Sequence, residues 1–190
     1  AASGKRLGVV WVDAHGDLNT PATSRSGNVH GMPLAALLGH GDRALSSIGG
    51  AHPALRASDV ALVGLRDLDD AEREHIHKWH VKALSMRALD ERGVRAVMEE
   101  AIAHATHDTA GIWLSFDMDV IDPDEAPGVG TPVVGGITYR EAHLAMEMLA
   151  DSGKLIGLDL VEVNPVLDER NRTAEIAREL ILSALGKRIL

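Results

Sequence analysis

Short apolar runs alternate with amphipathic stretches along most of the chain. Residues 7–12 (LGVVWV) are apolar and rich in β-branched side chains, a pattern typical of a strand covered on both faces, and they end abruptly in polar DAHGD. The same change from apolar to acidic predicts strands at 60–65, 112–116 and 155–161, with an extra strand at 81–85. Helical spacing between these runs predicts helices at 32–38, 70–79, 86–104, 139–150 and 173–185.

This alternation predicts an α/β fold with a mainly parallel sheet, because parallel neighbours need a crossover connection. Helices on both faces would make three layers, α/β/α. Ligands of such sheets bind outside the carboxyl ends of the strands, and four predicted strands end there in acidic segments. We therefore expect the active site at the C-terminal ends of the strands. No linker or internal repeat interrupts the pattern, so residues 1–190 are predicted to form a single domain.

Composition excludes several classes of function. The 190 residues are 45% hydrophobic and 25% charged, an ordinary globular composition with enough length for a sizeable core. Asp and Glu outnumber Lys and Arg by 28 to 19, and the net charge of −9 disfavours nucleic acid as a partner. No apolar run approaches the roughly 18 residues of a membrane span, so no membrane partner is expected. The lack of cysteine excludes thiolate metal sites and fits a cytoplasmic location.

Acidic side chains at two predicted strand ends form the main candidate site. Asp13, His15 and Asp17 alternate directly after the first strand, so an extended segment would point all three to one side. Asp117 and Asp119 repeat this spacing after another strand. A solvated turn explains either motif alone. Together the carboxylates would repel one another without a cation, which predicts Mn²⁺ or Mg²⁺, with Zn²⁺ as a third option and room for two ions.

From residue 11 to its end the sequence resembles the arginases of the ureohydrolase family, most closely the bacterial ones. The resemblance rests on VDAHGDLNTPATSRSGNVHGMPLAALLG, VGLRDLD, SFDMDVIDPDEAPGVGTPVVGGITYREAHLAMEML and GLDLVEVNPVLDERNRTAE, which cover nearly the whole chain. The DAHxD and SFDxDxxDP motifs are shared with agmatinases, so they identify the family but not the substrate. The NTPxTSxSGNxHG loop discriminates better, because arginases use it to recognise the amino-acid end of arginine.

The resemblance implies manganese-dependent hydrolysis of L-arginine to L-ornithine and urea. Two Mn²⁺ ions per subunit would bind a bridging hydroxide that attacks the guanidinium carbon. Asp17 would handle the proton of this hydroxide, His30 would act as a proton shuttle, and Glu162 would pair with the guanidinium. Without the resemblance, His30 would be an ordinary loop histidine. The metal ligands implied in this way are Asp13, His15, Asp17, Asp117 and Asp119.

A pocket for the substrate head is also implied by the resemblance. Hydrogen-bond donors on Asn19, Ser26 and Asn28 suit the α-carboxylate, and the carboxylate of Asp69 suits the α-ammonium group. Ordinary turn chemistry would explain the residues of this loop as well, and a structural hydroxyl would explain Thr131. The implied substrate-binding residues are Asn19, Ser26, Asn28, Asp67, Asp69, Glu72, Thr131 and Glu162.

The sequence departs from the family at one place. Arginases carry an earlier Gly-Asp-His-Ser motif whose histidine binds the first manganese, and no segment here matches it. One metal would keep His15 and three aspartates, whereas the other would lack its imidazole. The chain also begins AASG, without Met, close to a predicted strand. We expect an N-terminally truncated arginase-like catalytic domain with an uncovered sheet edge, the greater part of a longer enzyme. A second chain that supplies the missing part is one alternative.

Other functions remain as rivals at this stage. An agmatinase-type ureohydrolase would act on a guanidine without the α-amino acid head. A catalytically impaired metal-binding relative would bind metal without releasing urea. Two-metal phosphoester hydrolysis is disfavoured, because no cluster of Arg or Lys accompanies the acidic residues to hold phosphate. Since the family forms trimers or hexamers, a homotrimer or homohexamer is expected.

Overall fold

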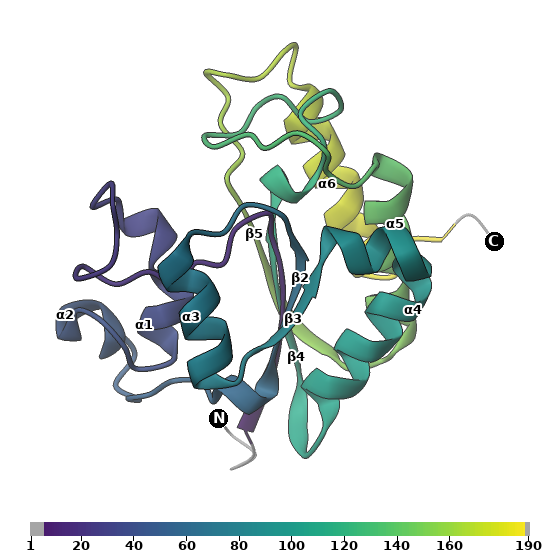
Figure 1. Cartoon of the computed structure of the whole chain (residues 1–190). Coiled ribbons are helices and arrows are strands. Elements are labelled where there is room, and N and C mark those ends of the chain that lie inside the picture. Colours follow the sequence, from purple (N-terminus) through teal and green to yellow (C-terminus); the bar gives the residue numbers. More distant parts are fainter. Residues whose placement is uncertain (1–5, 189–190) are drawn as a thin grey trace.

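A computed structural model describes residues 6–188 and contains one five-stranded sheet in that range (Figure 1). Neighbouring strands all pair in parallel, in the order β3-β2-β1-β4-β5. The predicted α/β fold with a mainly parallel sheet is confirmed. The AASG start, from which a missing beginning was inferred, lies outside the described residues. The strands are β1 (Arg6–Val12), β2 (Val60–Leu65), β3 (Lys82–Ser85), β4 (Thr109–Asp117) and β5 (Leu155–Val161).

Helices cover both faces of the sheet, as the three-layer prediction requires. In Figure 1, α1, α2 and α3 lie on one side of the strands, and α4, α5 and α6 lie on the other. None of the helices within residues 6–188 combines the length and apolar composition needed to cross a bilayer. The α-helices are α1 (Pro33–Leu37), α2 (Arg43–Ser46), α3 (Asp70–Trp79), α4 (Met86–Thr106), α5 (Tyr139–Asp151) and α6 (Arg172–Ala184), and the 3-10 turns are η1 (Val29–Gly31), η2 (Ala57–Asp59) and η3 (Met118–Val120).

The helix α2 was not predicted, because its four residues are too few to show a helical period. A cap supports it locally: the side chain of Asp42 accepts a hydrogen bond from the amide of Ala44. By contrast, α3 and α5 were predicted within one residue at each end. Both begin with a capping box, formed by Asp69 with Glu72 and by Thr138 with Glu141.

Alternate residues of β1 enter two separate cores. Val10 and Val12 pack in the larger cluster, which lies under α4, α5 and α6. Val9 and Trp11 pack in the smaller cluster, which includes residues of α1 and α3. Successive strand side chains point to opposite faces, so an uninterrupted apolar run is what a strand covered on both sides needs. The apolar run that predicted β1 therefore has its explanation in burial on both faces.

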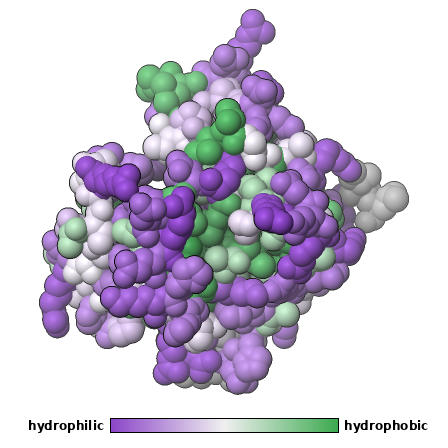
Figure 2. All heavy atoms as spheres, in the orientation of Figure 1, coloured by the Kyte–Doolittle hydropathy of each residue, from purple (hydrophilic) through white to green (hydrophobic). Residues whose placement is uncertain are grey.

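The strand β5 is an edge of the sheet in the described part of the chain. Ile156 on this strand is 58% exposed, and Trp113 on the neighbouring β4 is 39% exposed. This edge is therefore partly exposed among residues 6–188, and the expectation that missing strands uncover it stays a prediction. On the face of the molecule shown in Figure 2, hydrophilic residues dominate, and the most hydrophobic surface lies in the middle and in patches near the top.

Trp79, at the end of α3, lies between two histidine rings. The ring centroid of His40 is 3.8 Å from that of Trp79 with an interplanar angle of 7°, and the ring of His75 stacks at 4.1 Å and 12°. Burial lowers the pKa of His40, and the nearby positive charges of His75 and Lys78 lower it further. The folded protein therefore resists protonation of His40 more than the unfolded chain does.

This shift predicts a loss of stability in acid. A histidine whose pKa is lower in the folded state contributes stability above its unfolded pKa of about 6.5, and this stability is lost as the pH falls through the folded pKa. We expect His40→Gln to flatten the decline in unfolding free energy below about pH 6.5. Urea unfolding of the metal-free protein over a pH series measures the unfolding free energy. The control is His107→Gln, because the side chain of His107 is 81% exposed. An unchanged acid slope in His40→Gln would contradict the prediction.

Candidate metal centre and substrate pocket

The acidic segments meet at the centre of the sheet, where the strand order reverses. From β1 the chain builds outward through β2 to β3, and it then returns to place β4 on the other side of β1. Val12 pairs with Phe116, so Asp13 and Asp117 follow side by side. In open α/β sheets, ligands bind outside the carboxyl ends of the strands at such a point. The topology therefore brings two distant acidic motifs together at a binding position.

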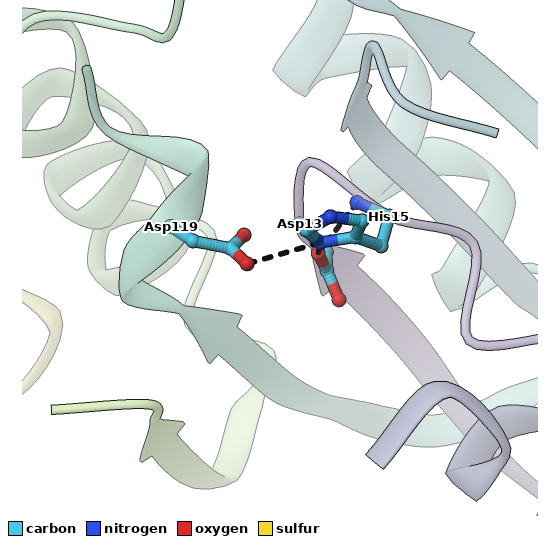
Figure 3. Close-up of side chains that lie close together, drawn as sticks. All are labelled: Asp13, His15 and Asp119. Atoms are coloured by element: carbon cyan, nitrogen blue, oxygen red, sulfur yellow. Dashed lines mark hydrogen bonds and ion pairs between the residues drawn. The ribbon is translucent and has the colours of Figure 1, made fainter. Parts of the chain in front are cut away.

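Asp13, His15 and Asp119 form the tightest group of potential metal ligands. One ligand atom from each of the three lies within 4.8 Å of the others (Figure 3). The Nδ1 atom of His15 is 3.0 Å from Oδ2 of Asp119 and 3.5 Å from Oδ1 of Asp13. Asp13 and Asp119 are each only 1% exposed. The three side chains come from the loop after β1 and from η3, and they converge on one point.

Neighbouring donors orient both carboxylates of this group. Asp13 accepts hydrogen bonds from the amide of His15 at 2.7 Å and from the indole Nε1 of Trp11 at 3.1 Å. Asp119 accepts from the amide of Ala14 at 3.3 Å and from the hydroxyl of Thr131 at 3.2 Å. Each carboxylate is thus held in a fixed orientation before any ligand arrives, as effective metal sites require.

The ionisable side chains in and around this group shift the pKa values of one another. Although burial lowers the pKa of His15, hydrogen bonds to the carboxylates of Asp119 and Asp13 raise it to about 11. Burial raises the pKa of Asp117 to about 9, with further contributions from the charges of Asp13 and Asp119. Burial also raises the pKa of Asp17, followed by the charges of Asp13 and Asp117. Without a cation, burial and mutual repulsion thus favour the protonated, neutral forms of Asp17 and Asp117.

The donor set fits a divalent cation. Carboxylates and one imidazole, without sulfur, are suitable ligands for Mn²⁺ or Mg²⁺, and a cation would favour the ionised carboxylates that burial disfavours. Asp17 and Asp117 lie near the three-residue group, as their mutual charge effects show, but they are not members of it. The five-ligand binuclear centre therefore stays a prediction, whereas a buried Asp–His–Asp group able to bind a metal is present.

Two residues with predicted catalytic roles have left-handed backbone. Asp17 has a φ of +54°, and Glu162, which follows β5, has a φ of +65°. This conformation is uncommon for side chains larger than glycine, and such strain is concentrated at functional sites. Glu162 is half-buried, and its charge raises the pKa of Asp117. Its carboxylate therefore lies near enough to Asp117 for their charges to interact, and its pairing with a guanidinium stays a prediction.

The residues implied for the substrate head are divided between a buried network and an exposed loop. The amide Nδ2 of Asn19 donates to Oδ2 of Asp69 at 2.9 Å. The carboxylate of Glu72 is buried and accepts from the amides of Leu18 and Asp69, at 3.3 and 3.2 Å. Glu72 thus joins the loop after β1 to the start of α3. The implied substrate contacts of all these residues stay predictions.

The other residues implied for the substrate head lie at the surface of the protein. Ser26, Asn28 and His30 are exposed, and the hydroxyl of Ser26 accepts from the amide of Asn28 at 3.2 Å. Asp67 is also exposed, and its carboxylate is 3.9 Å from Nε2 of His15. Asp67 therefore lies beside the metal group, on the side that faces solvent. No contact between His30 and the metal group is seen among residues 6–188, so its function as a proton shuttle stays a prediction.

Sequence reasoning missed two residues that support this site. Trp11 appeared only as part of an apolar strand, but its indole binds the carboxylate of Asp13. Arg66 appeared only inside the VGLRDLD segment, but its guanidinium contacts the backbone beyond Asp119. A polar atom on Trp11 two residues before an acidic ligand was the available signal for the first. No sequence signal indicated the contacts of Arg66.

Comparison with known proteins agrees with this geometry. Residues 1–186 match the Arginase family. The chain belongs to the arginase family. An arginase of Brevibacillus brevis is 53% identical over 186 residues, which cover 98% of this chain and 62% of that relative. The resemblance inferred from the motifs is thus confirmed.

Solved structures of the family show the same fold. The native structure of the arginase of Bacillus caldovelox, at 52% identity, matches with a TM-score of 0.95 over 97% of this chain and 62% of the other. The arginase of Entamoeba histolytica in complex with L-ornithine is 37% identical, with a TM-score of 0.90 over 97% of this chain and 62% of the other. The chain therefore spans about 62% of the length of these family members.

Proposed function

We propose that the protein hydrolyses L-arginine to L-ornithine and urea with two bound Mn²⁺ ions, as part of a longer arginase. The observation that carries the proposal is the buried group of Asp13, His15 and Asp119 at the centre of a sheet of the arginase fold. A relative of the same fold has been solved with L-ornithine, the expected product. One sheet with a core on each side supports the proposal that residues 1–190 form a single catalytic domain.

Individual residues would divide the chemistry. Asp13, His15, Asp17, Asp117 and Asp119 would hold the ions, and bound Mn²⁺ would supply the Lewis acidity that makes water nucleophilic near neutral pH. The carboxylate of Glu162 would orient the guanidinium by accepting a pair of hydrogen bonds from its N–H groups. The carboxylate of Asp17 would accept a proton during attack, and the imidazole of His30 would carry a proton to the departing amine.

The loop after β1 would select the amino-acid head of the substrate. Ser26 and Asn28 are exposed and free of contacts with the buried acidic residues, so their donors can meet an α-carboxylate from solvent. Asn19 presents its amide to Asp69, which would hold the α-ammonium group from the other side. Asp67, Glu72 and Thr131 would shape the pocket between the head and the metal group.

Urea release tests this proposal directly. The protein is incubated with excess Mn²⁺, and urea is measured from L-arginine and, in parallel, from agmatine, together with the number of Mn²⁺ ions bound per chain. We expect a clear preference for L-arginine. Glu162→Gln should bind Mn²⁺ like the wild type but release much less urea, because it keeps the size of the side chain and loses the charge that pairs with the guanidinium.

Each alternative predicts a different result. A preference for agmatine would contradict recognition of the α-amino acid head and favour an agmatinase-type ureohydrolase. Binding of Mn²⁺ without urea from either substrate would favour a catalytically impaired metal-binding relative. Equal urea release by Glu162→Gln and wild type would remove Glu162 from the proposed machinery.

A further inference from the structure

Arg66 connects separate segments around the metal group. It follows β2, and its guanidinium donates to four backbone carbonyls. Nη2 bonds the carbonyl of Asp119 at 2.7 Å and that of Val133 at 2.6 Å. Nη1 bonds the carbonyl of Val120 at 3.2 Å, and Nε bonds that of Val134 at 3.3 Å. One side chain thus joins η3 to the loop that follows Thr131.

The backbone of Arg66 extends this connection to the loop after β1. Its amide donates to the carbonyl of Ala14 at 2.9 Å, between Asp13 and His15. The amide of Ala14 in turn bonds the carboxylate of Asp119, and so does the hydroxyl of Thr131. Arg66 is therefore in contact with three segments that place or orient members of the buried Asp–His–Asp group: the loop after β1, η3 and the loop that follows Thr131.

The guanidinium is well suited to this position. Its five N–H donors lie in a rigid plane, so one group can satisfy several carbonyls at fixed angles, which an ammonium group cannot do. Burial lowers the pKa of Arg66, and nearby carboxylates, Asp119 first, act in the opposite direction. Its half-buried charge is directed at carbonyl oxygens rather than paired with one carboxylate, as expected for a group that fixes backbone.

We infer that Arg66 is a positioning residue of the metal centre: it holds Asp119 and the Thr131 loop in a fixed relation and thereby sets the affinity of the site for divalent metal. The inference rests on the proposed function only in requiring that the Asp–His–Asp group binds Mn²⁺. It assigns Arg66 no contact with metal or substrate.

Charge and position predict opposite effects at this residue. A positive charge near the site repels a divalent cation, so removal of the charge alone would tighten Mn²⁺ binding. Loss of the fixed position would weaken binding, because outer-shell partners of metal ligands typically contribute about 10- to 100-fold in affinity. The sign of the change in Mn²⁺ affinity therefore separates the two explanations.

Mn²⁺ titration of the protein, followed by the electron paramagnetic resonance of free Mn²⁺, tests the inference in Arg66→Met and Arg66→Lys. We expect both variants to bind Mn²⁺ about 10- to 100-fold more weakly than wild type. Arg66→Lys keeps the charge but lacks the planar set of donors, so it should not rescue affinity. In the metal-free variants, amides of residues 135–137 should exchange hydrogen faster, since Gly135 and Gly136 donate to Asp122 in the loop that Arg66 holds.

Arg6→Met is the matched control. Arg6 also joins two segments through its guanidinium, which donates to the buried carboxylate of Asp59 at 2.7 Å, but it lies at the opposite end of β1 from the metal group. This variant should lose stability and keep wild-type Mn²⁺ affinity. It shows how far the loss of a stabilising ion pair distant from the metal group changes the measured Mn²⁺ affinity.

Three results would overturn the inference. Wild-type or tighter affinity in Arg66→Met would show that Arg66 does not position the ligands. Wild-type affinity in Arg66→Lys would show that charge suffices. Absence of Mn²⁺ binding by wild type would overturn the inference and the metal centre together, whereas binding without urea release would contradict the proposed function and leave the role of Arg66 to be decided by the affinities.

Discussion

Asp119→Asn is expected to abolish the stabilisation of this protein by Mn²⁺. Oδ2 of Asp119 is 3.0 Å from Nδ1 of His15, and both lie in the only group of three potential ligands found among residues 6–188. The substitution removes a negative charge and replaces the carboxylate by an amide with a single neutral oxygen, a weaker ligand, while the size of the side chain is kept. Because no other carboxylate shares this position, we expect binding to weaken by more than the roughly 10- to 100-fold typical of outer-shell changes.

The thermal shift supplies the measurement. A ligand present at about 100 times its Kd adds about 2.7 kcal/mol to stability, which for a domain of this size corresponds to a rise in Tm of about 5–10 °C. Wild type should show this rise on addition of Mn²⁺ at that concentration, and Asp119→Asn should show none. Asp124→Asn makes the same charge change at an exposed position five residues along and should keep the full shift. An equal shift in Asp119→Asn would exclude this carboxylate as a ligand.

Phe116→Ala is expected to lose about 3–5 kcal/mol of unfolding free energy, a large part of the roughly 5–15 kcal/mol that such domains have. Phe116 is the only phenylalanine of the chain, is 0% exposed, and belongs to the larger core cluster. It lies near the end of β4, the strand between the central β1 and β5 that carries Asp117, and it pairs in register with Val12 and Leu160 on these two neighbours. Truncation to Ala removes most of a large side chain and leaves a cavity that the strands on either side cannot close.

Urea unfolding of the metal-free protein measures this loss as a change of midpoint at constant slope. Phe116→Leu should lose much less, because leucine fills most of the same space with another apolar side chain. If Phe116→Ala lost less than about 2 kcal/mol, the neighbouring helices would have to move into the space, and the large core would be more adaptable than its burial indicates.

The sequence by itself determined the elements and their class. The continuous apolar run at 60–65 coincides with β2, because a strand covered on both faces needs such a run, and the mainly apolar run at 155–161 coincides with β5 at the edge of the sheet. Helical spacing predicted α3 at its observed bounds, and its capping box of Asp69 with Glu72, found in the structure, also depends only on residues three positions apart. The alternation of Asp13 with His15 indicated ligands on one side of an extended segment, and the structure brings both to one point. Each of these inferences depends on neighbours in sequence.

Tertiary structure alone decided which of these residues meet. The order of the strands places Asp119, 104 residues after His15, beside that imidazole, and it leaves Asp17 and Asp117 outside the tightest group. The contacts of Arg66 with carbonyls of η3 and of the loop after Thr131 have no sequence pattern, because a backbone carbonyl is the same at every residue. Local periodicity and capping are encoded by nearby side chains, whereas contacts across the sheet depend on how β1, β2 and β4 are ordered and how their loops close.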